Sequence, residues 1–260
     1  MLGSVESLWR YPVRSMRGEM LERVEVSPRG VVGDRSYSVV DAPRNLRVTV
    51  GDAPRRWMRM LEAEARFAGE PRLHSAPPPV RIRFDDGAEC DSDDPGAAAW
   101  LSEKLAQPVA LWRDPDAAGA APADEAGGAA ASGAAPRHAY EAAPLHLITT
   151  ASLRAAAAQQ PDARFDPVRF RPNIVIDTGS AEGFLEDGWL GRTLALGDAL
   201  RIEVHERSER CVMTTLGQGD LARDPRIFQT VARANQRCFG VYARVLTPGH
   251  LRRGDSVTLL

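Results

Sequence analysis

The chain has 260 residues, of which 43% are hydrophobic and 26% charged, a composition that excludes a fibrous or wholly disordered protein. Lysine and arginine together number 33 against 35 acidic residues, a net charge of −2, which argues against a protein that coats nucleic acid. Every basic residue except Lys104 is arginine, so any anion site here must be built from guanidinium groups.

The cysteines and the amino-terminal sequence exclude further classes of protein. Cys90, Cys211 and Cys238 stand at no paired spacing, which disfavours a disulfide scaffold, a zinc ribbon and an iron–sulfur cluster. The amino terminus carries no basic stretch followed by an apolar run, and no segment reaches the length of a membrane span. We therefore expect a cytoplasmic protein with neither a membrane segment nor a nucleic-acid partner.

The first part of the chain, residues 1–113, predicts a β-rich domain. Apolar residues alternate with polar ones over residues 5–9, 21–26 and 35–40, a period that is typical of half-buried strands. Residues 97–105 instead carry apolar side chains at helical spacing and predict a short helix.

A low-complexity stretch, residues 114–136, follows this domain. Its alanine, glycine, proline and small polar residues offer almost nothing to bury, so we interpret it as a loop or linker.

Residues 137–260 predict a second domain with more strands than helices. A strand over 145–148 leads into a helix over 150–159, and a later helix ends at Asn235, with Asp224 as its cap and Pro225 in its first turn. The remaining predicted strands are 173–177, 193–196, 200–204, 237–245 and 256–260. Because the order is not βαβ, the fold class is α+β, mainly β, and barrel-like rather than doubly wound.

The segment from Arg210 to Thr215 is the most informative motif, because it places the Cys211 thiol beside a fixed cation. Arginine favours the thiolate, which attacks electrophiles and binds soft metals, although cysteine also fills space in protein cores. A thiol hydrolase that pairs Cys211 with His146 is a further possibility. Nucleotide-binding glycine motifs are absent from the sequence, which disfavours a nucleotide-dependent enzyme.

Three other clusters combine arginine or a hydroxyl with a rigid proline or glycine. They are residues 11–15, 33–35 and 169–173. Each alone reads as a turn with a solvated arginine, but together they offer guanidinium and hydroxyl groups that suit an anion and the edge of a heterocycle.

In this order, the motifs resemble those of the MOSC family, and within it the group that includes the mitochondrial amidoxime reducing component and its bacterial relatives. The resemblance covers nearly the full length and rests on residues 11–15, 33–35, 145–150, 169–174, 210–211, 239–242 and 254–255. It implies an N-terminal MOSC β-barrel domain over 1–113 and a C-terminal, barrel-like MOSC domain with flanking helices over 137–260. Molybdenum cofactor would be held between them.

The resemblance also implies roles for individual residues. Cys211 matches the cysteine that supplies a thiolate to molybdenum and is therefore both the catalytic and the metal-binding residue, with Arg210 favouring its ionised form. Arg14, Ser15 and Arg35 match the positions that clasp the phosphate of the pterin, although relatives often carry lysine in place of Arg14. The positions matching the pterin-binding residues are Thr149, Thr150, Arg171, Asn173 and Asp255.

The function implied is a molybdenum-dependent oxidoreductase that reduces N-hydroxylated substrates such as hydroxylamines and amidoximes. The chain lacks the cysteines of a fused cluster, so electrons would come from a separate protein of the ferredoxin, flavodoxin or cytochrome type. The alternative is a module that carries molybdenum cofactor or sulfur without reductase activity.

Overall fold

The computed structural model describes residues 1–114 and 143–260. Strands dominate this part of the chain, which confirms the predicted mainly-β, α+β fold class. The strands are β1 (Gly3–Arg10), β2 (Glu19–Leu21), β3 (Arg23–Ser27), β4 (Gly30–Val31), β5 (Tyr37–Asp41), β6 (Leu46–Arg47), β7 (Ala63–Phe67), β8 (Val80–Phe84), β9 (Glu89–Asp91), β10 (Val109–Arg113), β11 (Leu145–Thr149), β12 (Ile174–Asp177), β13 (Thr193–Leu196), β14 (Leu200–Glu209), β15 (Cys238–Thr247), β16 (Gly249–Arg252) and β17 (Ser256–Leu259). The α-helices are α1 (Pro54–Trp57), α2 (Ala97–Leu105), α4 (Thr150–Gln159) and α5 (Arg226–Asn235), and the 3₁₀ helices are η1 (Met58–Glu62), η3 (Pro167–Arg169), η4 (Leu185–Trp189) and η5 (Val212–Thr215).

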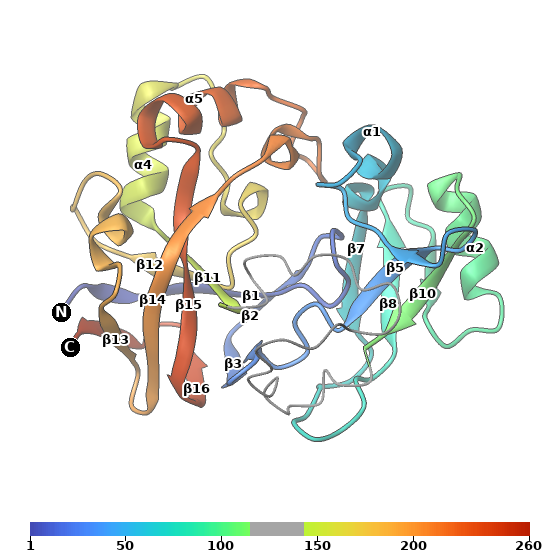
Figure 1. Ribbon diagram of the computed structural model, residues 1–260, viewed down its shortest axis with the longest axis horizontal. Helices are drawn as coiled ribbons and strands as arrows, with labels where there is room; N and C mark the ends of the chain where they lie inside the picture. Colours follow the sequence, from blue (N-terminus) through green and yellow to red (C-terminus); the bar gives the residue numbers. More distant parts are fainter. Residues whose placement is uncertain (115–142) are drawn as a thin grey trace, which may run out of the picture.

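A closed barrel forms the larger body, on the left in Figure 1. Its strand order in the described residues is β12-β11-β15-β14-β13-β17-β1, and β1 closes the ring by pairing with β12. Side chains from both ends of the chain fill the interior, among them Val5, Leu8, Leu147, Ile202 and Val257. The first strand of the chain is therefore part of a barrel built otherwise from strands after residue 143.

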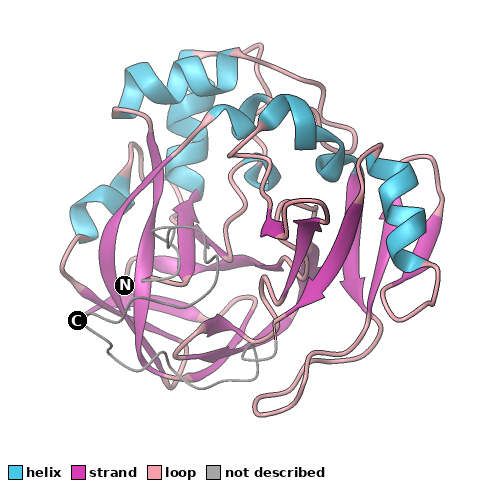
Figure 2. Cartoon of the chain, turned by 45° about the vertical axis from the view of Figure 1, so that its right-hand side comes forward, coloured by secondary structure: helices cyan, strands magenta, loops and turns pink. Residues whose placement is uncertain are grey.

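A second β body, on the right in Figure 1, contains the sheets β10-β5-β6 and β7-β8-β9 with α2 beside them. Its apolar core includes Val39, Trp57, Ile82 and Leu101, and Leu216 from the C-terminal part of the chain packs against it. Figure 2 shows that the helices gather along one side of the two bodies. None of the helices described is long and apolar enough to cross a bilayer.

The sequence predicted most of these elements. The helices over 97–105 and 150–159 have the predicted bounds, and the strand over 193–196 does as well. The strand predicted over 21–26 is wrong in one respect, because Glu22 divides it between β2, which pairs with β1, and β3, which pairs with β16. Helix α5 begins one residue later than predicted, since Pro225 takes the N-cap position and the Asp224 carboxylate accepts a hydrogen bond from the Arg226 amide at 3.0 Å.

The predicted domain boundaries stay a prediction. Of the linker predicted over 114–136, only Asp114 lies within the described residues, and the structure describes the second domain from residue 143 onward.

Candidate functional site

Tyr11 joins two of the predicted motif segments at the end of β1. Its amide donates a hydrogen bond to the Asp34 carboxylate at 2.7 Å, and its carbonyl accepts one from the Arg35 amide at 2.7 Å. Its hydroxyl donates to the Pro172 carbonyl at 3.1 Å. The segments 11–15, 33–35 and 169–173, which are far apart in the sequence, therefore lie against one another.

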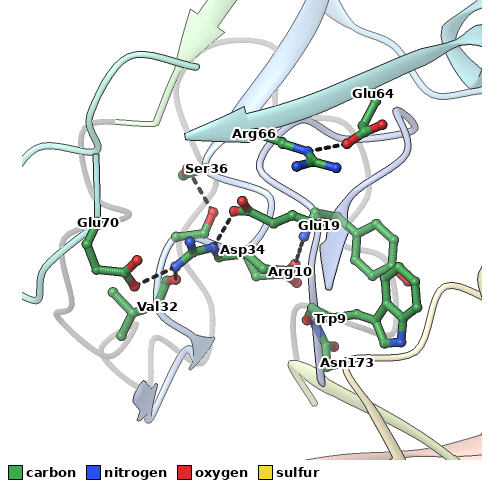
Figure 3. A network of polar contacts seen from close by, with 12 residues as sticks. Trp9, Arg10, Glu19, Val32, Asp34, Ser36, Glu64, Arg66, Glu70 and Asn173 are labelled. Carbon is green, nitrogen blue, oxygen red and sulfur yellow. Dashed lines mark hydrogen bonds and ion pairs between the residues drawn. The ribbon is translucent and has the colours of Figure 1, made fainter. Parts of the chain in front are cut away.

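Arg10, the last residue of β1, precedes Tyr11, and Figure 3 shows its polar contacts. Its buried guanidinium forms ion pairs with Glu19 at 2.8 Å and Glu70 at 3.0 Å, and it lies 5.0 Å from the centroid of the Phe67 ring. The carboxylates of Glu19 and Glu70 neutralise the charge of the Arg10 guanidinium. Arg10 also donates to the Val32 carbonyl at 3.4 Å, and we infer that it has a structural role next to the turn that begins at Gly33.

Arg171 is a buried cation of a different kind. Its Nη1 donates to the Met16 carbonyl at 2.6 Å, whereas its buried Nη2 has no hydrogen-bond partner. Among the described residues it forms no ion pair, and burial lowers the pKa of this guanidinium to about 10. A buried charge without a counter-ion is costly, so this position is suited to an anion.

Two further arginines surround this position. Arg35 lies 5.6 Å from the Tyr11 ring centroid and forms an ion pair with Asp34. Arg210 donates to the Phe170 carbonyl at 2.8 Å and the Ser208 hydroxyl at 2.7 Å, and its buried Nε has no partner. We call Arg35, Arg171 and Arg210 the arginine cluster.

Backbone strain marks two members of this cluster and the nearby Ser15. Ser15, Arg35 and Arg171 have φ angles of 64°, 55° and 55°, in the left-handed region that side chains with a Cβ seldom occupy. Such conformations persist where the surrounding structure enforces them, often at binding sites. Three predicted site residues therefore share a backbone feature that the sequence gives no means to foresee.

Arg14 and Ser15 lie where the two bodies meet. The Arg14 amide donates to the Tyr37 carbonyl at 2.9 Å, and the Ser15 hydroxyl accepts a hydrogen bond from the Val50 amide at 3.1 Å. The loop that contains Val50 is thereby tied to the segment that carries the predicted phosphate ligands.

Cys211 is solvent-exposed and follows Arg210 at the start of η5. It faces the loop of Val50, because a Cβ built on Gly51 would lie 4.0 Å from its Sγ. A cysteine that only fills space in the core would have to be enclosed by apolar side chains. The Cys211 thiol is not enclosed in this way. The described residues contain no group of three or more His, Cys, Asp or Glu side chains that could hold a metal ion, so a metal at Cys211 would need its other ligands from a cofactor.

Thr149 and Thr150 lie at the far end of β11, away from the arginine cluster. Thr149 is buried, caps α4 by accepting a hydrogen bond from the Ser152 amide at 3.1 Å, and donates to Glu186 at 2.7 Å. Thr150 donates to Asp177 at 3.1 Å. These threonines are predicted pterin ligands, but their hydroxyls are used within the fold.

Asn173 and Asp255 also have structural contacts. Asn173 is fully buried, and its side-chain oxygen accepts a hydrogen bond from the His146 backbone amide at 3.1 Å. Its side-chain nitrogen donates to the Trp9 carbonyl at 3.4 Å, and Figure 3 labels both of these residues. Asp255 accepts from the Arg252 amide at 2.8 Å, and its carbonyl pairs with Val5, near the opposite end of β1 from Tyr11. Their predicted contact with a pterin has no support from this geometry.

The structure does not support the possible thiol hydrolase in which Cys211 is paired with His146. The imidazole is buried, and its two nitrogens lie 3.3 Å from the Arg171 carbonyl and 3.1 Å from the Phe239 carbonyl. Burial, followed by the charge of Arg210, lowers the pKa of His146 to about 3. A ring held in this way is not placed to take the proton of an exposed thiol.

The sequence interpretation missed Tyr11 as a site residue, although it belongs to the first motif. Tyr11 supports two members of the arginine cluster on one ring, and burial raises its pKa, so its hydroxyl stays protonated. The sequence feature that could have identified Tyr11 is an aromatic residue directly before Pro12 and close to several arginines.

Comparison with known proteins gives two family matches. The family model of the MOSC domain matches residues 134–258, and that of the MOSC N-terminal beta barrel domain matches residues 2–108. A molybdenum cofactor sulfurase of Drosophila grimshawi is 34% identical over 121 residues, which are 44% of this chain and 15% of that protein.

Two solved structures are also similar to the chain. The YUAD protein from Bacillus subtilis is 10% identical, with a TM-score of 0.49 over 100% of this chain and 96% of that one. YiiM from Geobacillus stearothermophilus is 18% identical, with a TM-score of 0.35 over 45% of this chain and 54% of that one.

Proposed function

Because the chain belongs to the MOSC family, we propose that it binds molybdenum cofactor and reduces N-hydroxylated compounds such as hydroxylamines or amidoximes. A separate electron-transfer protein of the ferredoxin, flavodoxin or cytochrome type would supply the electrons, in the cytoplasm. The observation that carries this proposal is a pair of buried, unpartnered guanidinium nitrogens on Arg171 and Arg210, the second of which directly precedes the exposed Cys211.

The residues present fit an anionic, sulfur-rich cofactor. The buried Arg171 Nη2 and Arg210 Nε each hold an unused N–H donor, and a guanidinium is suited to bidentate recognition of a phosphate or a carbonyl edge. Arg14, Ser15 and Arg35, which lie on the same junction, would bind the phosphate. Ser15 already has its oxygen fixed by the Val50 amide, so its hydroxyl direction is restricted.

Cys211 would be the protein ligand of the metal. Cys211 is exposed and directly follows Arg210 of the arginine cluster, and the absence of a side chain on Gly51 leaves space in front of its Sγ. When bound, the cofactor supplies a redox-active metal that can accept oxygen and electrons, chemistry that no side chain provides.

Expression in a host that makes the cofactor, followed by measurement of molybdenum and released pterin per chain, tests the binding step. We expect stoichiometric amounts of both. Turnover of a hydroxylamine with reduced methyl viologen as the electron source then tests the reaction without requiring the natural donor. A chain that is purified without molybdenum from such a host would contradict the proposal.

The similarity to the molybdenum cofactor sulfurase of Drosophila grimshawi favours a second candidate, a module that carries molybdenum cofactor or sulfur and does not reduce substrates. The match covers 15% of that protein, so we do not assign the activity of the whole relative to this chain. Full cofactor content combined with no turnover, tested with several electron donors, would favour the carrier.

A further inference from the structure

His146 lies between two segments that build the candidate site. The ring is 2% exposed, on β11, with Nδ1 facing the Arg171 carbonyl at 3.3 Å and Nε2 facing the Phe239 carbonyl at 3.1 Å. Gly240 makes room for this arrangement, because a Cβ built there would lie 2.7 Å from Nε2.

The two carbonyl oxygens pose a problem that a neutral imidazole cannot solve. A neutral ring has one N–H donor, so one of its nitrogens must point a lone pair at an oxygen lone pair. An imidazolium has two donors and would satisfy both carbonyls. The hydrogen-bonding geometry therefore suits the protonated ring.

Burial and neighbouring cations oppose that protonation. The pKa of His146 is lowered to about 3, first by burial and then by the charge of Arg210, with a smaller effect of Arg35, while the two carbonyls act in the opposite direction. The charged side chains that act on the ring are those of Arg210 and Arg35, and the Tyr242 ring lies beside it. Tyr11, Asp34 and Arg171 interact with these two arginines. Burial keeps Tyr11 neutral, and Asp34 is paired with Arg35, so the net field at the ring is positive.

We propose that His146 is a positioning residue for Arg171 which, at acidic pH, takes up a proton from solvent when an anion occupies the arginine cluster. This inference rests on the proposed function, in which the anion belongs to the cofactor. An anion there offsets the charges of Arg210 and Arg35 but not the effect of burial, so the ring gains a second N–H and holds both carbonyls at a higher pH than it does without the anion. By linkage, the same anion binds more tightly as the pH falls.

The test uses the full chain without cofactor and sulfate as the probe, because sulfate remains a dianion between about pH 4 and pH 7. Nitrogen-15 spectra of the histidine rings report the protonation of His146. We expect saturating sulfate to raise the midpoint of its titration by about two pH units, and sulfate to bind about tenfold more tightly at pH 4 than at pH 7.

Variants separate His146 from the other groups that titrate in this range. His146→Gln should lose most of the pH dependence of sulfate binding, whereas His250→Gln, the same change at an exposed position on β16, should keep it. Arg35→Gln should raise the midpoint of His146 without sulfate, a measurement that does not depend on whether His146→Gln folds.

The outcomes distinguish this inference from the proposed function. If sulfate shifts the backbone amides of residues 11–17 while His146 stays neutral down to about pH 4, the proton uptake is wrong and the anion site stands. If sulfate shifts none of these amides, the anion site and the inference both fail.

Discussion

The guanidinium of Arg171 lies over the ring of Tyr11, with its Cζ 4.2 Å from the ring centroid. The Tyr11 hydroxyl in turn donates to the carbonyl of Pro172, so the aromatic face and the cation are fixed by the same segment. A cation held by a ring face and a single carbonyl is stabilised less than one held by carboxylates. The fold therefore maintains a buried positive charge that an incoming anion can neutralise.

Arg171→Met should separate stability from binding. The unfolding free energy without ligand is expected to be unchanged or to rise by about 1 kcal/mol, because the variant buries no unpaired charge. Anion and cofactor binding should fall by more than tenfold, since charge-assisted hydrogen bonds are lost. Denaturant unfolding and cofactor content check the two effects.

The matched control is Arg169→Met in the same segment. Arg169 is 3% exposed and donates to four backbone carbonyls, those of Arg164, Thr214, Leu216 and Ala222. Its loss leaves these acceptors unsatisfied and should cost about 3 kcal/mol. If Arg171→Met destabilises the protein as much as Arg169→Met, Arg171 is a structural residue.

Cys211→Ser should keep the fold and lose molybdenum and turnover. The side chain is exposed, so the change in unfolding free energy should stay within about 0.5 kcal/mol. Serine is a poor ligand for a soft metal in place of a thiolate. Cys238→Ser, at a half-buried position, is the control and should retain molybdenum. Full reductase activity in the Cys211 variant would remove this cysteine from the site.

Periodicity predicted the elements that pack locally. Helix α2 matched its predicted bounds because its apolar spacing is regular, and β13 did so because residues 193–196 precede a tight turn. The hairpin of β7 and β8 went unpredicted even though β8 alternates buried and exposed residues along its length. No pattern in the sequence shows that β1 closes a barrel with β12, since that pairing spans more than half of the chain.

The site was predictable only in part, for a similar reason. The motifs placed Arg35, Arg171, Arg210 and Cys211 in the predicted site, and their roles as cofactor ligands stay predictions. Sequence order gives no information on which end of a strand faces the site, and Thr149 lies at the other end of β11 from the Arg171 segment. The pairing between distant strands decides this, and it appears only in three dimensions.

Glu186 should make stability depend on pH. It is fully buried, accepts hydrogen bonds from the Thr149 and Ser152 hydroxyls, and has its pKa raised, mainly by burial. A carboxyl whose pKa is higher in the folded state stabilises the fold below the unfolded pKa, and this contribution is lost as the pH rises through the folded pKa.

Glu186→Gln should therefore flatten the decline of the unfolding free energy as the pH rises above about 4.3, the ordinary value of glutamic acid. Glutamine retains an acceptor for the same hydroxyls and stays neutral throughout. Denaturant unfolding at a series of pH values measures the slope. An unchanged slope would show that Glu186 titrates equally in the folded and unfolded chains.

Gly240→Ala should be strongly destabilising, and Gly87→Ala shows how much of that effect is contact. The two glycines have nearly the same φ, 83° and 84°, so the backbone cost of adding a side chain is similar, about 1 kcal/mol.

At Gly87 nothing lies within 4 Å of the added Cβ, whereas at Gly240 it would lie 2.4 Å from the Leu147 carbonyl oxygen. Leu147 pairs with Val241 where β11 and β15 run side by side, so moving its carbonyl away would disturb this pairing. We expect a total loss of about 3 kcal/mol or more for Gly240→Ala, measured by denaturant unfolding, against about 1 kcal/mol for Gly87→Ala. Equal losses would mean that β15 can move away from β11, and then the position of His146 between its two carbonyls would not be fixed by Gly240.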